Sequence, residues 1–233
     1  MASKLSERDL HVLVAIGRFR MLTRPQVKRW FFADVSEPVV TRFVKRVESA
    51  GFVGIERVGG NGMQLLWLTR KGRDFLVGRG ACGVDIFPAV GPAAPKDFAH
   101  TVAIGDVAAW LVRRDPPPDE VLPAWAMQRY FGGALGVIPD LLALWRPAPA
   151  RLGAALSVEV DLGTEPLKSV FLPKLLKLDE TIRAWFPETE NCVLVLVPSQ
   201  RRAESLRTAA GDSSVRFMIH TFEETIQPVL TSP

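Results

Sequence analysis

The 233-residue sequence has little of the chemistry that usually marks a metal centre. Its two cysteines, Cys82 and Cys192, lie far apart and form no ligand spacing, so a structural zinc site is not expected and a reducing, cytoplasmic setting is favoured. Tyr130 is the single tyrosine, and with only three histidines in the chain no metal-assisted tyrosine nucleophile is expected. No apolar run approaches the roughly 18 residues of a membrane span, and the first residues lack the apolar core of a signal peptide.

The charge is distributed unevenly along the chain. With 48% hydrophobic and 23% charged residues, the composition is that of an ordinary soluble protein with one large or two small domains. The chain has 29 Lys/Arg and 25 Asp/Glu residues. Residues 1–80 hold 15 of the basic and 7 of the acidic residues, which leaves 14 basic and 18 acidic residues for the remainder. The first third is therefore the part suited to meet a polyanion. A Gly/Ala/Pro-rich stretch predicts a linker at 80–97, between domains at 1–79 and 98–233.

The basic block predicts three helices, a hairpin and a fourth helix. Ser6, Thr23 and Ser36 stand at the expected N-caps of the first three helices. Gly51 is the expected stop of the third, and Thr69 opens the fourth. Two extended runs, 52–58 and 63–68, are joined by a Gly-Gly-Asn-Gly turn that accepts positive φ.

The third predicted helix has two distinct sides. Its apolar residues share one side, and its basic residues lie opposite. This split, followed by a Gly-rich hairpin, resembles a winged helix-turn-helix domain, with residues 36–50 as recognition helix and Gly59–Gly62 as wing tip. The resemblance implies these DNA-contacting residues: Thr41, Arg42, Lys45, Arg46 and Ser49 on the helix, Arg57 and Asn61 on the wing, and Lys71 and Arg73 nearer the backbone.

Two alternatives remain open for this basic face. It could be the solvated side of an ordinary surface helix, and some winged helices serve only protein contacts. The order of elements, the caps and the confinement of basic excess to this block favour DNA. Duplex DNA is favoured over RNA because no aromatic stacking platform lies on exposed strands.

The second block predicts a mixed sheet with helices packed on it, an α+β or α/β arrangement. A helix is expected at 98–114 and extended runs near 121–129 and 137–145. A strictly alternating strand follows at 155–161, and then a helix at 165–185 with Thr164 as cap and Pro173 as a break. Residues 192–198, 200–210 and 215–220 complete the block as strand, helix and strand.

Three carboxylates lie on two neighbouring predicted strands. Asp140 follows Pro139 on one, and Glu159 and Asp161 share a face of the next. An Asp on one strand and Glu-x-Lys on the next is the signature of the PD-(D/E)xK nucleases, which hold Mg²⁺ or Mn²⁺ with such acids. Here Asp161 stands where that Lys is expected. Lys174, on the apolar side of the following predicted helix, is the substitute we expect to reach the acids, with snorkelling to solvent as its alternative.

The wider pattern resembles the bacterial replication-relaxation family. The resemblance rests on His100-Thr101-Val102-Ala103-Ile104-Gly105-Asp106-Val107, Trp125 with Gln128, Pro139-Asp140, Lys174 and mainly Glu159-Val160-Asp161-Leu162-Gly163-Thr164-Glu165-Pro166. It implies a winged helix before a restriction-endonuclease-like domain, and DNA handling during replication or mobilisation of plasmids and other mobile elements. Gln128 stands where an acid is expected, which disfavours catalysis.

Three functions remain in view. The favoured one is a non-enzymatic regulator or replication factor. It binds double-stranded DNA as a homodimer without a cofactor, and its nuclease-like domain, expected to be catalytically degenerate, serves dimerisation or ligand binding. The alternative is a Mg²⁺- or Mn²⁺-dependent nuclease or nickase using Asp140, Glu159, Asp161 and Lys174. The third is an adaptor that offers the apolar helix 167–185 to a mobile-element protein.

Overall fold

The computed structural model describes residues 5–58, 62–80, 91, 98–132, 136–147, 152–211 and 217–225. Contacts divide the chain into two compact units, Met1–Gly105 and Asp106–Pro233, and each is described by itself. Most of the expected linker, and Asn61 at the expected wing tip, lie outside the described residues. No helix among the described residues is both long and apolar enough to cross a membrane.

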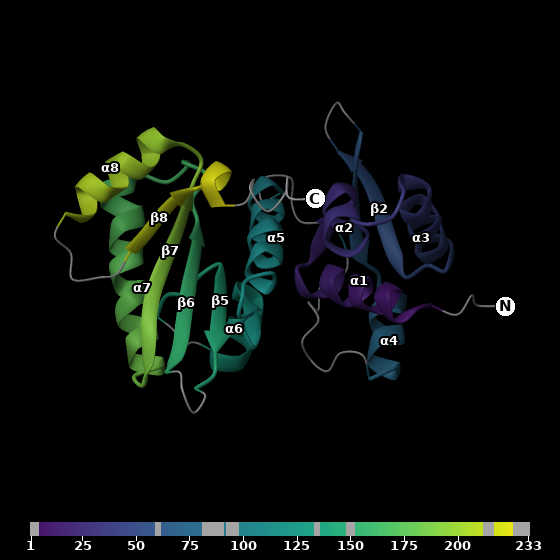
Figure 1. The fold of residues 1–233 in the computed structure, drawn as a ribbon, viewed down its shortest axis with the longest axis horizontal. Helices are drawn as coiled ribbons and strands as arrows, with labels where there is room; N and C mark the ends of the chain where they lie inside the picture. Colours follow the sequence, from purple (N-terminus) through teal and green to yellow (C-terminus); the bar gives the residue numbers. More distant parts are fainter. Residues whose placement is uncertain are drawn as a thin grey trace. The chain divides into compact units, whose positions relative to one another are not determined.

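The first unit combines helices with a small antiparallel sheet (Figure 1). The sheet has the order β1-β3-β2, in which β2 and β3 form the expected hairpin and β1 adds a short strand that the sequence did not suggest. Its elements are α1 (Glu7–Arg18), β1 (Met21–Thr23), α2 (Arg24–Phe31), α3 (Glu37–Ser49), β2 (Val53–Val58), β3 (Met63–Leu68), α4 (Arg70–Gly78) and the first part of α5 (Phe98–Val112).

Most helix ends are fixed by the residues expected to fix them. Ser6 with Asp9 and Thr23 with Gln26 form complete capping boxes, and the Thr69 hydroxyl accepts a hydrogen bond from Gly72 N. Gly51 follows α3 with φ +71°, in the left-handed region that glycine adopts without strain. The expectation for Ser36 was wrong in part: it occupies the N-cap of α3, but its side chain makes no capping hydrogen bond.

One face of α3 is locked into the core of this unit. Val40, Phe43, Val44 and Val47 are buried, and Phe43 packs on Phe32 with ring centroids 5.2 Å apart. The remaining core side chains come from α1, α2, α4 and the sheet. Burial of one helix face fixes which residues α3 presents outward.

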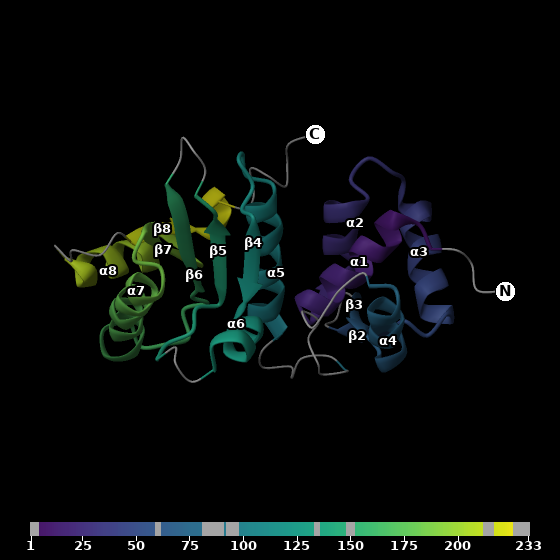
Figure 2. The ribbon, with the colours of Figure 1, turned by 90° about the horizontal axis from the view of Figure 1, so that it is seen from below.

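The second unit is built on a five-stranded mixed sheet (Figures 1 and 2). The order is β4-β5-β6-β7-β8; β4, β5 and β6 pair antiparallel, whereas β6, β7 and β8 pair parallel. After the last part of α5 come β4 (Glu120–Pro123), α6 (Ala124–Phe131), β5 (Leu141–Trp145), β6 (Gly153–Val160), a π-helical turn η3 (Leu167–Phe171), α7 (Leu172–Trp185), β7 (Thr189–Val197), α8 (Gln200–Ala210) and β8 (Phe217–Thr221). The α+β class is confirmed.

Three local expectations for this unit were wrong. The run 121–129 is not extended throughout: β4 ends at Pro123 and α6 begins at once, burying Ala126 and Met127. β5 begins at Leu141, so the strand is shorter than expected. Thr164 does not cap a helix, because Pro166 takes that position before the π-helical turn; Pro173 lies in the first turn of α7, where its missing N–H is tolerated.

Candidate functional site

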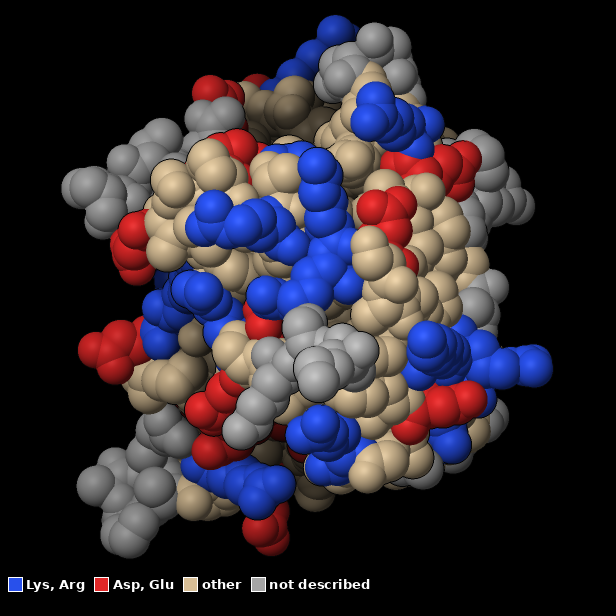
Figure 3. Space-filling model, turned by 90° about the vertical axis from the view of Figure 1, so that its right-hand side faces the viewer, with Lys and Arg blue, Asp and Glu red and all other residues tan. Residues whose placement is uncertain are grey.

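The outward face of α3 carries two uncompensated cations. Arg42 and Lys45 are exposed, as is Ser49, and neither cation forms an ion pair with any residue in the described ranges. Figure 3 looks toward the side of the first unit that carries α3, and Lys and Arg side chains gather near the centre of that view. This part of the helix is free to meet an external anion.

Arg46 is committed to the fold instead. Its Nη2 donates to Asp9 Oδ2 over 2.7 Å, and the Asp9 side chain is only 4% exposed. The same carboxylate oxygen accepts the Ser6 N–H of the α1 capping box. The structure gives Arg46 a partner that the sequence did not suggest: at the border of the two helix faces, it turns toward α1.

We expect Arg46→Ala to lower the free energy of unfolding by roughly 1–3 kcal/mol, because Asp9 stays buried without its cation. Urea unfolding measures this loss, and duplex-DNA binding at several salt concentrations should keep the wild-type salt slope. A smaller slope with unchanged stability would contradict the assignment and return Arg46 to the DNA-contacting set.

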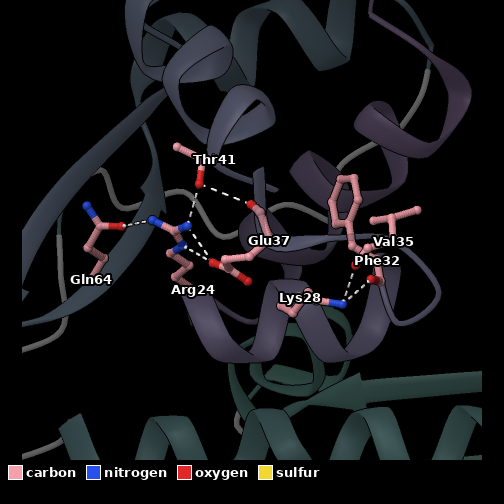
Figure 4. Close-up of polar contacts among 7 residues, drawn as sticks. All are labelled: Arg24, Lys28, Phe32, Val35, Glu37, Thr41 and Gln64. Atoms are coloured by element: carbon pink, nitrogen blue, oxygen red, sulfur yellow. Dashed lines mark hydrogen bonds and ion pairs between the residues drawn. The ribbon is translucent and has the colours of Figure 1, made fainter. Parts of the chain in front are cut away.

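Thr41 lies at the other border of the exposed face and is also engaged (Figure 4). Its hydroxyl accepts from Arg24 Nη2 over 2.7 Å and donates to the Glu37 carbonyl over 3.0 Å. Arg24 also donates to the Glu37 carboxylate from both Nε and Nη2, and from Nη1 to Gln64 Oε1 over 3.1 Å. The sequence offered one signal for Arg24 that was missed: a cation in the first turn of a helix needs a compensating acid.

The turn between α2 and α3 is closed by Lys28. Its ammonium donates to the carbonyls of Phe32, Ala33 and Val35 over 2.7, 3.0 and 2.6 Å; Figure 4 shows the first and last of these. A cation is favourable at the carbonyl end of a helix. Lys28 therefore fixes the entry into α3.

The other expected DNA-contacting residues differ in their surroundings. Arg57 is exposed on β2 and makes no ion pair with a described residue, and Gln64 faces it across the hairpin. Lys71 places its ammonium 5.8 Å from the centroid of the Phe52 ring. Arg73 pairs with the neighbouring Asp74 over 3.1 Å. Of these residues, Arg57 and Lys71 are the exposed cations that form no ion pair with a described residue.

In the second unit, Asp140 and Glu159 lie on adjacent strands. The antiparallel pairing of β5 with β6 brings Asp140 beside the end of β6, where its Oδ2 accepts the Val160 N–H over 2.8 Å. The Glu159 side chain is fully buried, and Lys174 Nζ donates to its Oε2 over 2.5 Å. Lys174 thus points inward to the acids, as expected from its position on the helix.

The Lys174 ammonium is held in its charged form. Burial lowers its pKa, but the charge and hydrogen bond of Glu159, with the charges of Asp140 and Glu165, outweigh burial and raise the pKa above 10.5. The group is therefore a fixed cation at neutral pH, not a proton acceptor.

Asp161 does not join the other two carboxylates. Its Oδ1 accepts from Gly163 N and its Oδ2 from Arg202 Nε, each over 2.7 Å, while Arg202 Nη2 donates to the Glu165 carbonyl. The alternation that placed Asp161 with Glu159 stops because β6 ends at Val160 and the chain turns at Gly163, where φ is +78°. The two oxygens of Asp161 are thus engaged by Gly163 and Arg202 and not by the groups around Glu159. Within the described ranges, no three His, Cys, Asp or Glu side chains are grouped to hold a metal ion.

A cavity of about 1030 Å³ lies within the second unit, on the face of the sheet opposite Glu159. Leu156 on β6 and Leu194 on β7 point to the opposite face of the sheet from Glu159 and Val195. These two leucines form part of the cavity floor, and Trp110 and Trp145 also line the cavity. Its volume is in the range of small-molecule sites.

A comparison with protein-family models assigns the chain. The replication-relaxation model matches residues 13–186, which is more than half of the sequence. The chain belongs to the replication-relaxation family. Membership indicates a replication-related function. No curated protein and no solved structure shows significant similarity to the chain.

The replication-relaxation match spans α2, α3, the hairpin, β5, β6 and η3, and reaches the end of α7. It therefore includes Asp140, Glu159 and Lys174, but it ends before α8 and Arg202. Arg202, which forms the ion pair with Asp161, therefore lies outside the matched region. On helix α7, Leu175 is fully buried and Trp185, although 38% exposed, packs edge-on against Phe131, whereas Leu176 is 37% exposed.

Proposed function

We propose that this protein is a replication-related DNA-binding factor of a plasmid or other mobile element. It binds duplex DNA through a winged helix-turn-helix in its first unit, with α3 in the major groove and the β2–β3 hairpin on the adjacent backbone. The observation that carries the proposal is the pair Arg42 and Lys45, exposed and without ion pairs in the described structure on a helix whose other face is buried.

The dimensions and chemistry of α3 support base reading. Its 13 residues make a helix roughly 20 Å long, which fits the major groove. An Arg guanidinium forms two hydrogen bonds to the major-groove edge of guanine, and a Lys ammonium reaches either guanine or phosphate. Arg57 on the hairpin then supplies a phosphate contact outside the groove.

Two ion pairs support a non-enzymatic role for the carboxylate cluster. Lys174 is bound to Glu159 and Arg202 to Asp161, so both of these cations already neutralise an acid. The second unit then serves dimerisation or ligand binding, and a homodimer would read a palindromic site.

Selection from a pool of randomised duplexes tests the proposal. We expect enrichment of one sequence, with a dissociation constant at least ~10³-fold below that for unrelated DNA at physiological salt. Equal binding of all duplexes at that salt would refute it. Incubating supercoiled plasmid with Mg²⁺ or Mn²⁺ is the companion measurement: we expect wild type and Asp140→Ala to show the same background nicking, and cleavage confined to wild type would reinstate the nuclease.

A further inference from the structure

Arg24 joins three elements of the first unit through one guanidinium. It is the first residue of α2, and it bonds Glu37 and Thr41 on α3 and Gln64 on β3 (Figure 4). Four hydrogen bonds leave from Nε, Nη1 and Nη2. Because the guanidinium is planar and its donors point in fixed directions, these partners are held at set angles to one another.

Stability alone does not account for this arrangement. The Arg24 and Glu37 side chains are 25% and 56% exposed, and exposed ion pairs contribute little to folding. A cation in the first turn of α2 is also unfavourable toward the helix dipole, while Glu37 is favourable in the first turn of α3. What the contacts supply is a fixed geometry between α3 and the hairpin.

The partners of Arg24 are direct neighbours of the proposed DNA contacts. Thr41 precedes Arg42 on α3, and Gln64 is paired with Arg57 across the hairpin. We propose that Arg24 is a positioning residue that sets the recognition helix against the wing and so determines sequence discrimination. This inference rests on the proposed function, and it names a residue that acts through Arg42 and Arg57 without reading DNA itself.

A direct phosphate contact is the competing role for Arg24, because one N–H of Nη1 is left over from the four bonds. The two roles predict different salt dependences of the DNA affinity. A phosphate contact adds about one unit to the slope of log affinity against log salt and strengthens binding to every sequence alike. A positioning residue leaves that slope unchanged and affects the preferred sequence alone.

The experiment measures affinity for the selected duplex and for unrelated duplex, over a salt series, for wild type, Arg24→Ala, Gln64→Ala and Arg24→Ala/Gln64→Ala. Arg201→Ala, an exposed arginine of α8, is the matched control. We expect Arg24→Ala to weaken binding to the selected duplex about tenfold or more, with unrelated binding, salt slope and thermal unfolding close to wild type. The double variant should lose no more than Arg24→Ala, because both changes break one connection.

Each other outcome overturns a defined claim. Weaker binding to both duplexes with a slope smaller by about one would make Arg24 a phosphate contact. An unchanged ratio of the two affinities in both Arg24→Ala and Gln64→Ala would end the positioning role while leaving DNA binding intact. Wild type without any sequence preference would remove the proposed function and this inference together. Gln64→Ala keeps the Arg24–Glu37 pair, so it still decides the matter should Arg24→Ala fold poorly.

Discussion

Lys174→Met is expected to destabilise the second unit by roughly 3 kcal/mol, the lower end of the cost of removing one partner of a buried ion pair, because Lys174 itself is 31% exposed. The Glu159 side chain is fully buried, and Lys174 donates to it over 2.5 Å from α7. Methionine keeps the apolar part of the side chain, so the loss reports the missing charge. Urea unfolding followed by circular dichroism measures the change.

Two further variants separate the ion pair from other effects. Lys177→Met removes an exposed lysine of the same helix and should shift the unfolding free energy by no more than about 0.5 kcal/mol. Lys174→Met/Glu159→Leu removes both charges and should recover most of the loss, because a buried pair can be replaced by apolar side chains at little cost. A loss below about 1 kcal/mol for Lys174→Met would show that Glu159 does not depend on this cation.

The same pair predicts a pH dependence at alkaline pH. The folded-state pKa of Lys174 is raised, because Glu159, Asp140 and Glu165 outweigh the effect of burial. A raised pKa stabilises the folded state fully below the unfolded value of 10.5, and the contribution is lost as pH rises through the higher folded value. The difference in unfolding free energy between wild type and the double variant should therefore be constant from neutral pH to about 10, and above it wild type should lose stability relative to the double variant.

Local features were predictable from the sequence because their partners lie three or four residues away. The capping boxes at Ser6 and Thr23, the glycine after α3 and the buried face of that helix follow from backbone geometry and side-chain periodicity. The inward orientation of Lys174 belongs to the same class, because helical spacing placed it among apolar residues.

Partners distant in the chain were not predictable in this way. Arg46 meets Asp9 on α1, and Arg202 reaches Asp161 from α8. A helical wheel or a strand alternation says which way a side chain points but not which element faces it. Strand alternation failed for Asp161 because it lies just beyond the end of β6. Arg46 lies at the border of the two faces of α3, and Asp161 lies just beyond the end of β6, where a small rotation changes the neighbour of a charged side chain.

The exposed pair on α3 gives the largest effect expected for DNA binding. Arg42→Ala/Lys45→Ala should weaken binding to the selected duplex by roughly 2–6 kcal/mol, since each good base contact contributes about 1–3 kcal/mol. Thermal unfolding should stay close to wild type, because both side chains are exposed and pair with no described residue. Fluorescence anisotropy with the selected duplex measures the loss.

The single variants assign a role to each cation. If Arg42 reads a base and Lys45 binds phosphate, Arg42→Ala relaxes the sequence preference at one position, and Lys45→Ala weakens all duplexes and lowers the salt slope by about one. Glu48→Gln, which removes an acid from the exposed part of the same helix, is the matched control and should bind as well as wild type or slightly better. Wild-type affinity in the double variant would exclude α3 as the recognition helix, because no other described residues of that helix offer a cation free of the fold once Arg46 is held by Asp9.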